Sequence, residues 1–205
     1  MKNVKIKVCG ITKTEEVRWL IDEGVDYCGV VMFFPESKRN TDAKQAGDIV
    51  NMAAGRIKTV AVTVSPLVEQ LKVIEQLGFD YIQVHGTLEQ DVHKMAAIPI
   101  IRAINVQCGI DQLEVLKEDK ICGMLYDGSK PGAGKTFDWN VMEGVNRYGK
   151  MLILAGGLNP NNVGQAIEKI GPDVVDVSSG VEYDDRLGKD PDKIKAFVRE
   201  CRQLG

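Results

Sequence analysis

The sequence predicts an α/β fold, a compact (β/α)8 barrel of the TIM-barrel class. Short apolar runs rich in Val and Ile recur along the whole 205-residue chain, and amphipathic segments separate them. Such alternation indicates a parallel sheet whose strands are joined by helical crossovers. Eight units favour a closed barrel, although about 250 residues is the usual size of one. Since no linker-like segment interrupts the pattern, we expect residues 1–205 to form a single barrel domain.

Eight of the apolar runs are expected to form the barrel strands. Several are almost continuously apolar, which is typical of parallel strands that are covered on both faces. In chain order they are Lys5–Cys9, Tyr27–Phe33, Thr59–Val64, Tyr81–His85, Ile100–Ile104, Cys122–Tyr126, Leu152–Ala155 and Val174–Ser178.

Roughly eight helices are expected to alternate with these strands. The clearest are Thr14–Glu23, Leu67–Leu77, Asn161–Ile170 and Pro191–Leu204. Pro191 suits the first turn of a helix, where a missing N–H is tolerated. Gly24, Gly78 and Gly171 follow expected helix ends, where a residue with left-handed backbone geometry is usual.

A doubly wound open sheet is the alternative fold. It normally carries a glycine-rich loop directly after its first strand. Here the first expected strand continues into Cys9-Gly10-Ile11-Thr12, which is not such a loop. The closed barrel is therefore the preferred prediction.

Charge and composition argue against several functional classes. The net charge is −3, from 26 basic and 29 acidic residues, and no basic stripe is present, so we expect no nucleic-acid partner. The longest apolar stretch, Val30–Phe34, is too short to span a bilayer, and Met1–Lys7 does not resemble a signal peptide. We expect a cytoplasmic protein without a membrane partner. The 5 widely spaced cysteines contain no C-x-x-C pair, so neither a disulfide framework nor a metal site is expected.

Polar residues that end apolar strands are the candidate catalytic groups, because barrel enzymes carry their chemistry at the C-terminal ends of the strands. Cys9 and Asp127 end the first and sixth expected strands. Across the barrel mouth they would supply a thiolate base and a carboxylic acid for acid–base catalysis. Each has a simpler explanation when taken alone, since a buried Cys is usually inert and an Asp often caps a turn.

Three further polar residues are candidates for substrate binding. Arg39 lies on the loop after the second strand, where its planar guanidinium would suit a carboxylate. His85 ends the fourth strand, and Asp176 lies near the end of the eighth. An exposed Arg is most often only solvated, and a His at a strand end often only packs. The evidence from each position alone is therefore weak.

The loops after the seventh and eighth strands predict a phosphate site. Gly156 and Gly157 lie between a strand and a helix, and Ser178, Ser179 and Gly180 follow the last strand. In barrels these two loops often bind a phosphate through backbone N–H groups and a helix N-terminus. The predicted partner is thus a phosphorylated small molecule.

The segment Gly128–Gly134 is the main glycine-rich stretch of the chain, and Gly134-Lys135-Thr136 resembles the end of a nucleotide-binding P-loop. In a P-loop, a further glycine would stand at position 129, which is Ser, and a long helix would follow directly. Neither condition is met. We expect instead a loop that closes over a ligand.

Six short motifs carry a resemblance to a known family. They are Lys7–Thr12, Phe34–Arg39, Ile82–Gly86, Gly134–Trp139, Leu154–Pro160 and Asp176–Glu182. In this order they resemble the motifs of phosphoribosylanthranilate isomerases, and Lys189-Asp190-Pro191 extends the match to the last helix. Any one motif would be weak, but six in register make the resemblance specific.

The resemblance implies a small barrel enzyme of tryptophan biosynthesis that uses no cofactor. The implied reaction is an Amadori rearrangement of N-(5'-phosphoribosyl)anthranilate to 1-(2-carboxyphenylamino)-1-deoxyribulose 5-phosphate. By position, Asp127 resembles the general acid that opens the ribose ring, and Cys9 the general base that deprotonates the adjacent sugar carbon. Arg39 resembles the arginine that binds the anthranilate carboxylate, and the Gly156-Gly157 and Ser178–Gly180 loops resemble the phosphate cradle.

Two positions depart from the family pattern. Asn40-Thr41 follows Arg39 where an aromatic residue is more usual, and Val62–Ser65 stands where Phe and Asn are usual. Both segments are expected near the rim of the pocket. They bear on substrate affinity and not on the reaction.

Two alternative functions follow from the same fold. Another phosphate-binding barrel is the nearer one: an indole-glycerol-phosphate synthase would need catalytic Lys and Glu at strand ends. A sugar isomerase of histidine biosynthesis would need paired Asp on the first and fifth strands, where this chain has Cys9 and Arg102. A catalytically inactive binding barrel is the other, against which Cys9, Asp127 and Arg39 argue. The sequence does not decide between a monomer and a homodimer.

Overall fold

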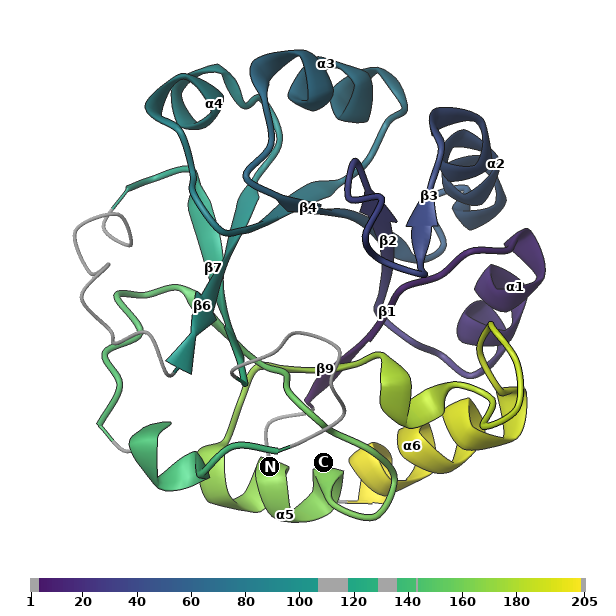
Figure 1. The fold of residues 1–205 in the computed structure, drawn as a ribbon. Helices are drawn as coiled ribbons and strands as arrows, with labels where there is room; N and C mark the ends of the chain where they lie inside the picture. The colour runs from purple at the N-terminus through teal and green to yellow at the C-terminus, as the bar shows by residue number, and fades with distance from the viewer. Residues whose placement is uncertain (1–3, 107–117, 129–135, 143, 204–205) are drawn as a thin grey trace.

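The structure, a computed structural model, describes residues 4–106, 118–128, 136–142 and 144–203. Within these residues nine parallel strands form one sheet, in the spatial order β1-β9-β8-β7-β6-β5-β4-β2-β3. Strand β1 pairs with both β9 and β2, which closes the sheet into the barrel that Figure 1 shows end-on. The strands are β1 (Lys5–Cys9), β2 (Tyr27–Met32), β3 (Asn40–Thr41), β4 (Lys58–Val64), β5 (Tyr81–His85), β6 (Ile100–Asn105), β7 (Ile121–Asp127), β8 (Met151–Leu154) and β9 (Val174–Val177).

The predicted (β/α)8 barrel is confirmed. Each of its eight strands begins and ends within one residue of the expected position. Strand β2 stops one residue early because Phe33 adopts a left-handed φ of 58°, which an extended strand does not accommodate. The short strand β3 was not expected. It pairs with β2, and the Thr41 hydroxyl donates a hydrogen bond to the Val31 carbonyl at 3.0 Å, so it holds the end of the loop that carries Arg39.

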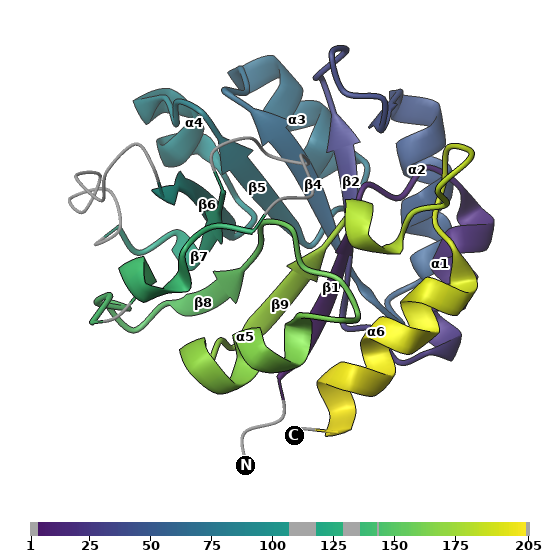
Figure 2. The ribbon, with the colours of Figure 1, turned by 60° about the horizontal axis from the view of Figure 1, so that its bottom comes forward.

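The described residues contain six α-helices, which surround the barrel in Figures 1 and 2. They are α1 (Thr14–Asp22), α2 (Ala43–Ala53), α3 (Val68–Gln76), α4 (Gln90–Met95), α5 (Val163–Ile170) and α6 (Pro191–Gln203). The expectation of a helix after every strand fails between β7 and β8, where the described residues form only the short 3-10 helix Trp139–Met142. Gly144, Tyr148 and Gly149 have positive φ there, which interrupts a helix. Most of the β6–β7 crossover lies outside the described residues.

Side chains alternate between the two faces of the barrel wall, as the period of a β-strand requires. On β1, Ile6 and Val8 point outward into the core under the helices, whereas Lys7 and Cys9 point into the barrel. The N-terminal end of the interior is filled by residues at strand starts. There, Tyr27 and Tyr81 meet edge to face with ring centres 5.9 Å apart. This packing leaves the C-terminal end of the barrel as the open one.

Among the described residues, none of the helices combines the length and apolar character needed to cross a membrane. Cys9, Cys28, Cys122 and Cys201 are free thiols, and Cys108 lies outside the described residues. The same residues contain no group of His, Cys, Asp and Glu side chains arranged to hold a metal ion.

Candidate active site

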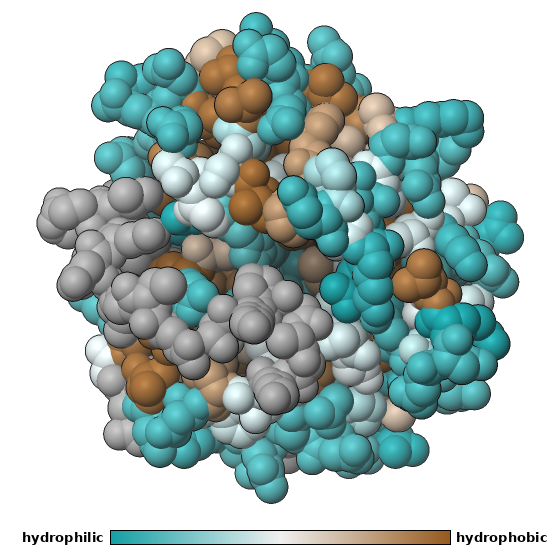
Figure 3. Space-filling model, viewed as in Figure 1, coloured by the Kyte–Doolittle hydropathy of each residue, from teal (hydrophilic) through white to brown (hydrophobic). Residues whose placement is uncertain are grey.

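A cavity of about 860 Å³ opens at the C-terminal ends of the strands. Figure 3 looks onto this face of the barrel and shows it hollowed near the centre. With the exception of Gly180, the structure brings the sequence-predicted site residues together in the cavity wall: Cys9, Arg39, His85, Asp127, Gly156, Gly157, Asp176, Ser178 and Ser179.

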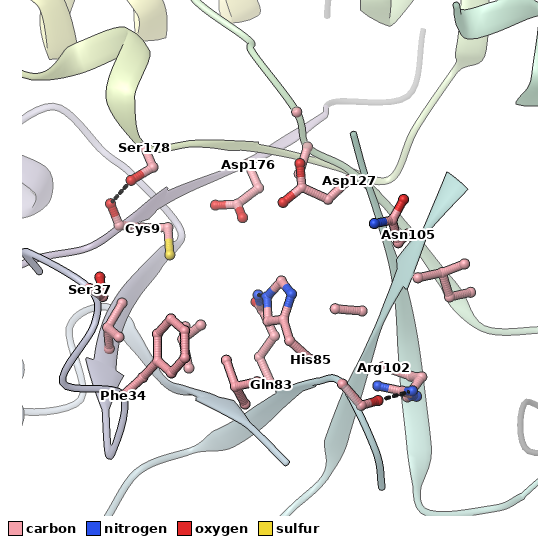
Figure 4. Close-up of a pocket in the computed structure, with 18 of the residues that line it drawn as sticks. Cys9, Phe34, Ser37, Gln83, His85, Arg102, Asn105, Asp127, Asp176 and Ser178 are labelled. Atoms are coloured by element: carbon pink, nitrogen blue, oxygen red, sulfur yellow. Dashed lines mark hydrogen bonds between the residues drawn. The ribbon is translucent and has the colours of Figure 1, made fainter. Parts of the chain in front are cut away.

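Cys9 is the last residue of β1 and lies in register with Gly29 of β2. A β-carbon at Gly29 would approach the Cys9 sulfur to 3.2 Å, so glycine at this position leaves room for the thiol. The Ser178 hydroxyl donates a hydrogen bond to the Cys9 carbonyl at 2.9 Å, as Figure 4 shows. The backbone of Cys9 is thereby tied to the loop after β9.

The Cys9 thiol has an environment of mixed charge. Burial is the largest influence and raises its pKa above the ordinary value. The cations of Lys7, Lys189 and Arg39 oppose this rise, and the carboxylate of Asp176 adds to it. The thiol form therefore predominates at neutral pH in the ligand-free protein.

Asp127 is the last residue of β7, and the N–H of Gly128 donates to its Oδ1 at 2.7 Å. Gly156 packs against this carboxyl group: it has a φ of 83°, and a β-carbon there would lie 3.1 Å from the Asp127 Oδ1. Burial, together with the nearby Asp176, raises the pKa of Asp127 to about 6 against the opposing effects of the Gly128 hydrogen bond and the Lys7 charge. Asp127 thus retains a useful protonated fraction near neutral pH, as a general acid requires.

Asp176 lies between Cys9 and Asp127 in the close-up of Figure 4, and its strand β9 lies between β1 and β7 in the sheet order. Its Oδ2 accepts a hydrogen bond from the Lys7 ammonium at 3.1 Å. Its Oδ1 is buried, and no described residue donates to it.

Arg39 is held by Glu182, whose Oε1 accepts from its Nε. The Lys189 Nζ lies 3.2 Å from the same oxygen, and the Lys38 Nζ lies 2.8 Å from Oε2. Burial alone would raise the pKa of Glu182, but the hydrogen bond from Arg39 and the charges of Lys189 and Lys38 lower it to about 2. Glu182 is therefore a permanent anion. No described residue accepts from the terminal nitrogens of Arg39, which lines the cavity.

His85 lies beside Gln83 on the inward face of β5, with 2.7 Å between the Nε2 atoms of the two side chains. Burial, and then the charges of Lys7 and Arg102, lower the pKa of His85 to about 4. The imidazole is therefore neutral at neutral pH. It offers the cavity hydrogen-bonding groups but no positive charge.

The predicted phosphate loops follow β8 and β9. Gly157 has a φ of 68°, and no described residue accepts a hydrogen bond from its N–H or from that of Ser179. Asn162 braces the first loop, because its side chain donates to the Gly157 carbonyl at 3.0 Å and accepts from the N–H of Asn159 at 2.8 Å. Backbone N–H groups without an acceptor, close to the start of a helix, are typical of anion-binding sites.

Gly180 takes a different position from its neighbours in this loop. A β-carbon on it would clash with the Leu158 carbonyl and lie 3.0 Å from Asn159. Gly180 thus allows the loop after β9 to pack closely on the loop after β8, and it does not line the cavity. Most of the expected closing loop, 129–135, lies outside the described residues.

Some of the residues that support the site were not predicted from the sequence, among them Lys189, Glu182 and Lys7. Lys189 lies behind the second phosphate loop and donates to the Ser178 carbonyl at 3.0 Å, and Glu182 fixes Arg39. Lys7 is the one with a sequence signal, because the two-residue period of β1 places it on the same face as Cys9. Glu182 has none, because its partner Arg39 is 143 positions away.

A carboxyl group with a raised pKa and a thiol thus share one cavity at the C-terminal end of a (β/α)8 barrel, the place where barrel enzymes carry their active sites. A family model described as N-(5'-phosphoribosyl)anthranilate (PRA) isomerase matches residues 6–200. The chain belongs to this family and is an isomerase.

Individual relatives agree with the family match. The chain is 38% identical over 200 residues to N-(5'-phosphoribosyl)anthranilate isomerase of Streptococcus mutans serotype c, covering 97% of this chain and 99% of the relative. It superposes with a TM-score of 0.81 and 32% identity on monomers generated from the dimeric phosphoribosylanthranilate isomerase of Thermotoga maritima, covering 98% and 100% of the two chains. A further isomerase structure, with the same scores and coverage, contains reduced 1-(o-carboxyphenylamino)-1-deoxyribulose 5-phosphate.

Proposed function

We propose that the cavity converts N-(5'-phosphoribosyl)anthranilate into 1-(2-carboxyphenylamino)-1-deoxyribulose 5-phosphate, with Asp127 as general acid and Cys9 as general base. The observation that supports these roles is the presence of both groups in one cavity, where the pKa of Asp127 is raised to about 6. A carboxyl group with this pKa can donate a proton near neutral pH, and a thiolate can accept one.

The reaction requires one group that donates a proton and another that accepts one, followed by a tautomerisation of the product. Asp127 donates its proton to the ring oxygen of the ribose, the bond between that oxygen and C1' breaks, and the anilino nitrogen forms a protonated Schiff base. The Cys9 thiolate then removes the proton from C2', and the electron pair moves toward the nitrogen to give an enol-amine. Transfer of the enol proton to C1' yields the ketone. No redox change occurs overall, so the chemistry requires no cofactor.

The substrate has two charged ends, and the cavity has a matching group for each. The anthranilate carboxylate would bind the terminal nitrogens of Arg39, with Phe34 of the same loop beside the aromatic ring. The phosphate would bind the N–H groups of Gly157 and Ser179 on the loops after β8 and β9. His85 and Asp176 line the space between, where the sugar hydroxyls would lie.

The test is the loss of phosphoribosylanthranilate fluorescence on addition of the purified protein. Cys9→Ser and Asp127→Asn should each lower kcat by about 10²- to 10⁴-fold, the usual contribution of acid–base catalysis. Cys28→Ala is the matched control, because this thiol is buried on the outward face of β2, away from the cavity. Turnover close to wild type in either site variant, with turnover retained in the control, would remove that residue from the mechanism.

A further inference from the structure

Lys7 is a fully buried cation that the proposed mechanism leaves without a role. Its side chain enters the barrel from β1, two residues before Cys9 and on the same face. It does not line the cavity, and its ammonium is bound by Asp176, its register partner on the neighbouring strand β9. Burial of an ammonium is costly even when it is paired, and an apolar side chain in its place would avoid that cost.

The Lys7 ammonium lies next to the Cys9 sulfur. A β-carbon on Gly29 would be 3.2 Å from the Lys7 Nζ and also 3.2 Å from the Cys9 Sγ. The two atoms therefore border the same small space, which only the absence of a side chain at Gly29 keeps open. Asp176 fixes the ammonium there, with 3.1 Å between the Lys7 Nζ and its Oδ2.

We infer that Lys7 is a positioning residue for the reaction: its ammonium, held below the cavity by Asp176, stabilises the thiolate form of Cys9 without touching the substrate. Lys7 has this role only if Cys9 is the base, as in the proposed function. A positive charge a few ångströms from a sulfur favours its ionised form, and the buried setting strengthens the interaction.

The other charges around Cys9 do not replace Lys7. Among the charged residues, Lys7 has the largest effect on the pKa of the Cys9 thiol, and it lowers that pKa. Asp176 raises the pKa, but by less than Lys7 lowers it. Burial raises the pKa of the neighbouring Cys28 thiol to about 12, so it stays neutral. The ionisable groups that affect the thiol are Lys7 on β1, Asp176 on β9, Arg39 on the loop after β2 and Lys189 before α6, whereas Cys28 lies on the outward face of β2.

The test measures the ionisation of Cys9 directly. The rate of Cys9 alkylation by iodoacetamide is followed against pH by peptide mass spectrometry in wild type, Lys7→Met and Lys7→Arg. Lys7→Met should raise the apparent pKa of the thiol by about 1 to 2 pH units, and Lys7→Arg should leave it near wild type. Asp176→Asn should shift it in the opposite direction. An alkylation profile in folded Lys7→Met that matches wild type would overturn the inference.

A second variant keeps the test valid if Lys7→Met does not fold because it leaves Asp176 unpaired. The double variant Lys7→Met/Asp176→Asn contains no buried charge at this place. Because Lys7 is the stronger influence on Cys9, the double variant should still show a thiol pKa above wild type. A value equal to wild type or below it would overturn the inference.

Kinetics separate this inference from the proposed function. Lys7→Met should lower kcat at neutral pH about tenfold for each pH unit by which the Cys9 pKa rises, with KM nearly unchanged. Loss of turnover in Cys9→Ser together with unchanged Cys9 titration in Lys7→Met would overturn the role of Lys7 alone. Full turnover in Cys9→Ser would overturn the proposed function and, with it, this role.

Discussion

Glu182 binds the Nε of Arg39 on the rim of the barrel mouth, although the two residues are 143 positions apart in the chain. The contact joins the loop after β2 to the segment after β9. It uses the inner nitrogen of the guanidinium, so the two outer nitrogens remain available to a ligand. The carboxylate of Glu182 thereby sets the direction in which Arg39 presents its positive charge.

Substitution of this pair should weaken carboxylate binding selectively. Arg39→Ala should cost about 1.5–3 kcal/mol in substrate binding, the contribution of a hydrogen bond to a charged group. Glu182→Gln should act in the same direction and less strongly, raising KM while kcat changes little. Inhibition constants for analogues with and without the anthranilate carboxylate provide the measurement.

Lys38→Ala is the matched control for this pair. Lys38 also binds Glu182, but its own side chain is 53% exposed, and exposed ion pairs contribute little. Binding of the carboxylate analogue should change only slightly. If Arg39→Ala weakened both analogues equally, Arg39 would support the loop and not bind the carboxylate.

The pH dependence of kcat/KM should be bell-shaped, with a broad plateau. The reactive form needs Asp127 protonated and Cys9 ionised, and the pKa of Asp127 is about 6 while burial holds that of Cys9 above its ordinary value. Below pH 6, kcat/KM falls tenfold per pH unit because the thiolate fraction of Cys9 falls while Asp127 stays protonated. Above the Cys9 pKa, kcat/KM falls because the protonated fraction of Asp127 falls while Cys9 stays ionised. Between the two pKa values the opposing changes cancel. A profile without an inflection near pH 6 would contradict this assignment. The substrate phosphate also titrates near pH 6, so the pKa of Asp127 needs a check without substrate.

Unfolding experiments on Asp127→Asn provide that check. The folded-state pKa of about 6 exceeds the unfolded value of about 3.9, so Asp127 adds stability below pH 4 that is lost as the pH rises through 6. The free energy of unfolding of Asp127→Asn should exceed that of wild type by about 2–3 kcal/mol at pH 8, and this gain should disappear near pH 4. Urea titrations at pH 4, 6 and 8 measure it. A difference that does not vary with pH would show that the carboxyl group titrates normally.

A side chain at Gly157 should block the phosphate site without disturbing the barrel. Its φ of 68° favours glycine, and a bulky group there would crowd an anion at the exposed N–H groups. Gly157→Val should raise KM sharply and abolish the protection that inorganic phosphate gives against thermal unfolding. Retained protection, or a phosphate bound elsewhere in a crystal with these loops empty, would contradict the assignment.

The parts of the site that the sequence predicts are those that depend on strand ends. Cys9 and Asp127 end runs of Val, Ile and Leu, so the barrel rule alone places them at the mouth. The residues that support them depend on contacts between distant segments. The ammonium of Lys7 is bound by Asp176, which is 169 positions away in the chain, and no local sequence pattern predicts that pairing.

Gly180 is a residue to which the sequence pattern assigns a different role from the one seen in the structure. Its place beside two serines predicts a phosphate contact, but the structure uses the missing side chain to let the loop approach the Leu158 carbonyl. A glycine that a ligand requires and one that packing requires look alike in a single sequence. Only the three-dimensional contacts distinguish them.

The ion pair between Lys7 and Asp176 joins the first strand of the barrel to the last, which gives the order of synthesis a physical consequence. When β1 leaves the ribosome, the ammonium of Lys7 has no carboxylate to meet, and water is its only low-cost partner. The interior around Cys9 must therefore stay hydrated until β9 has been made and inserted between β1 and β8. The environment of Cys9 is therefore complete only once β9 has paired with β1 and β8.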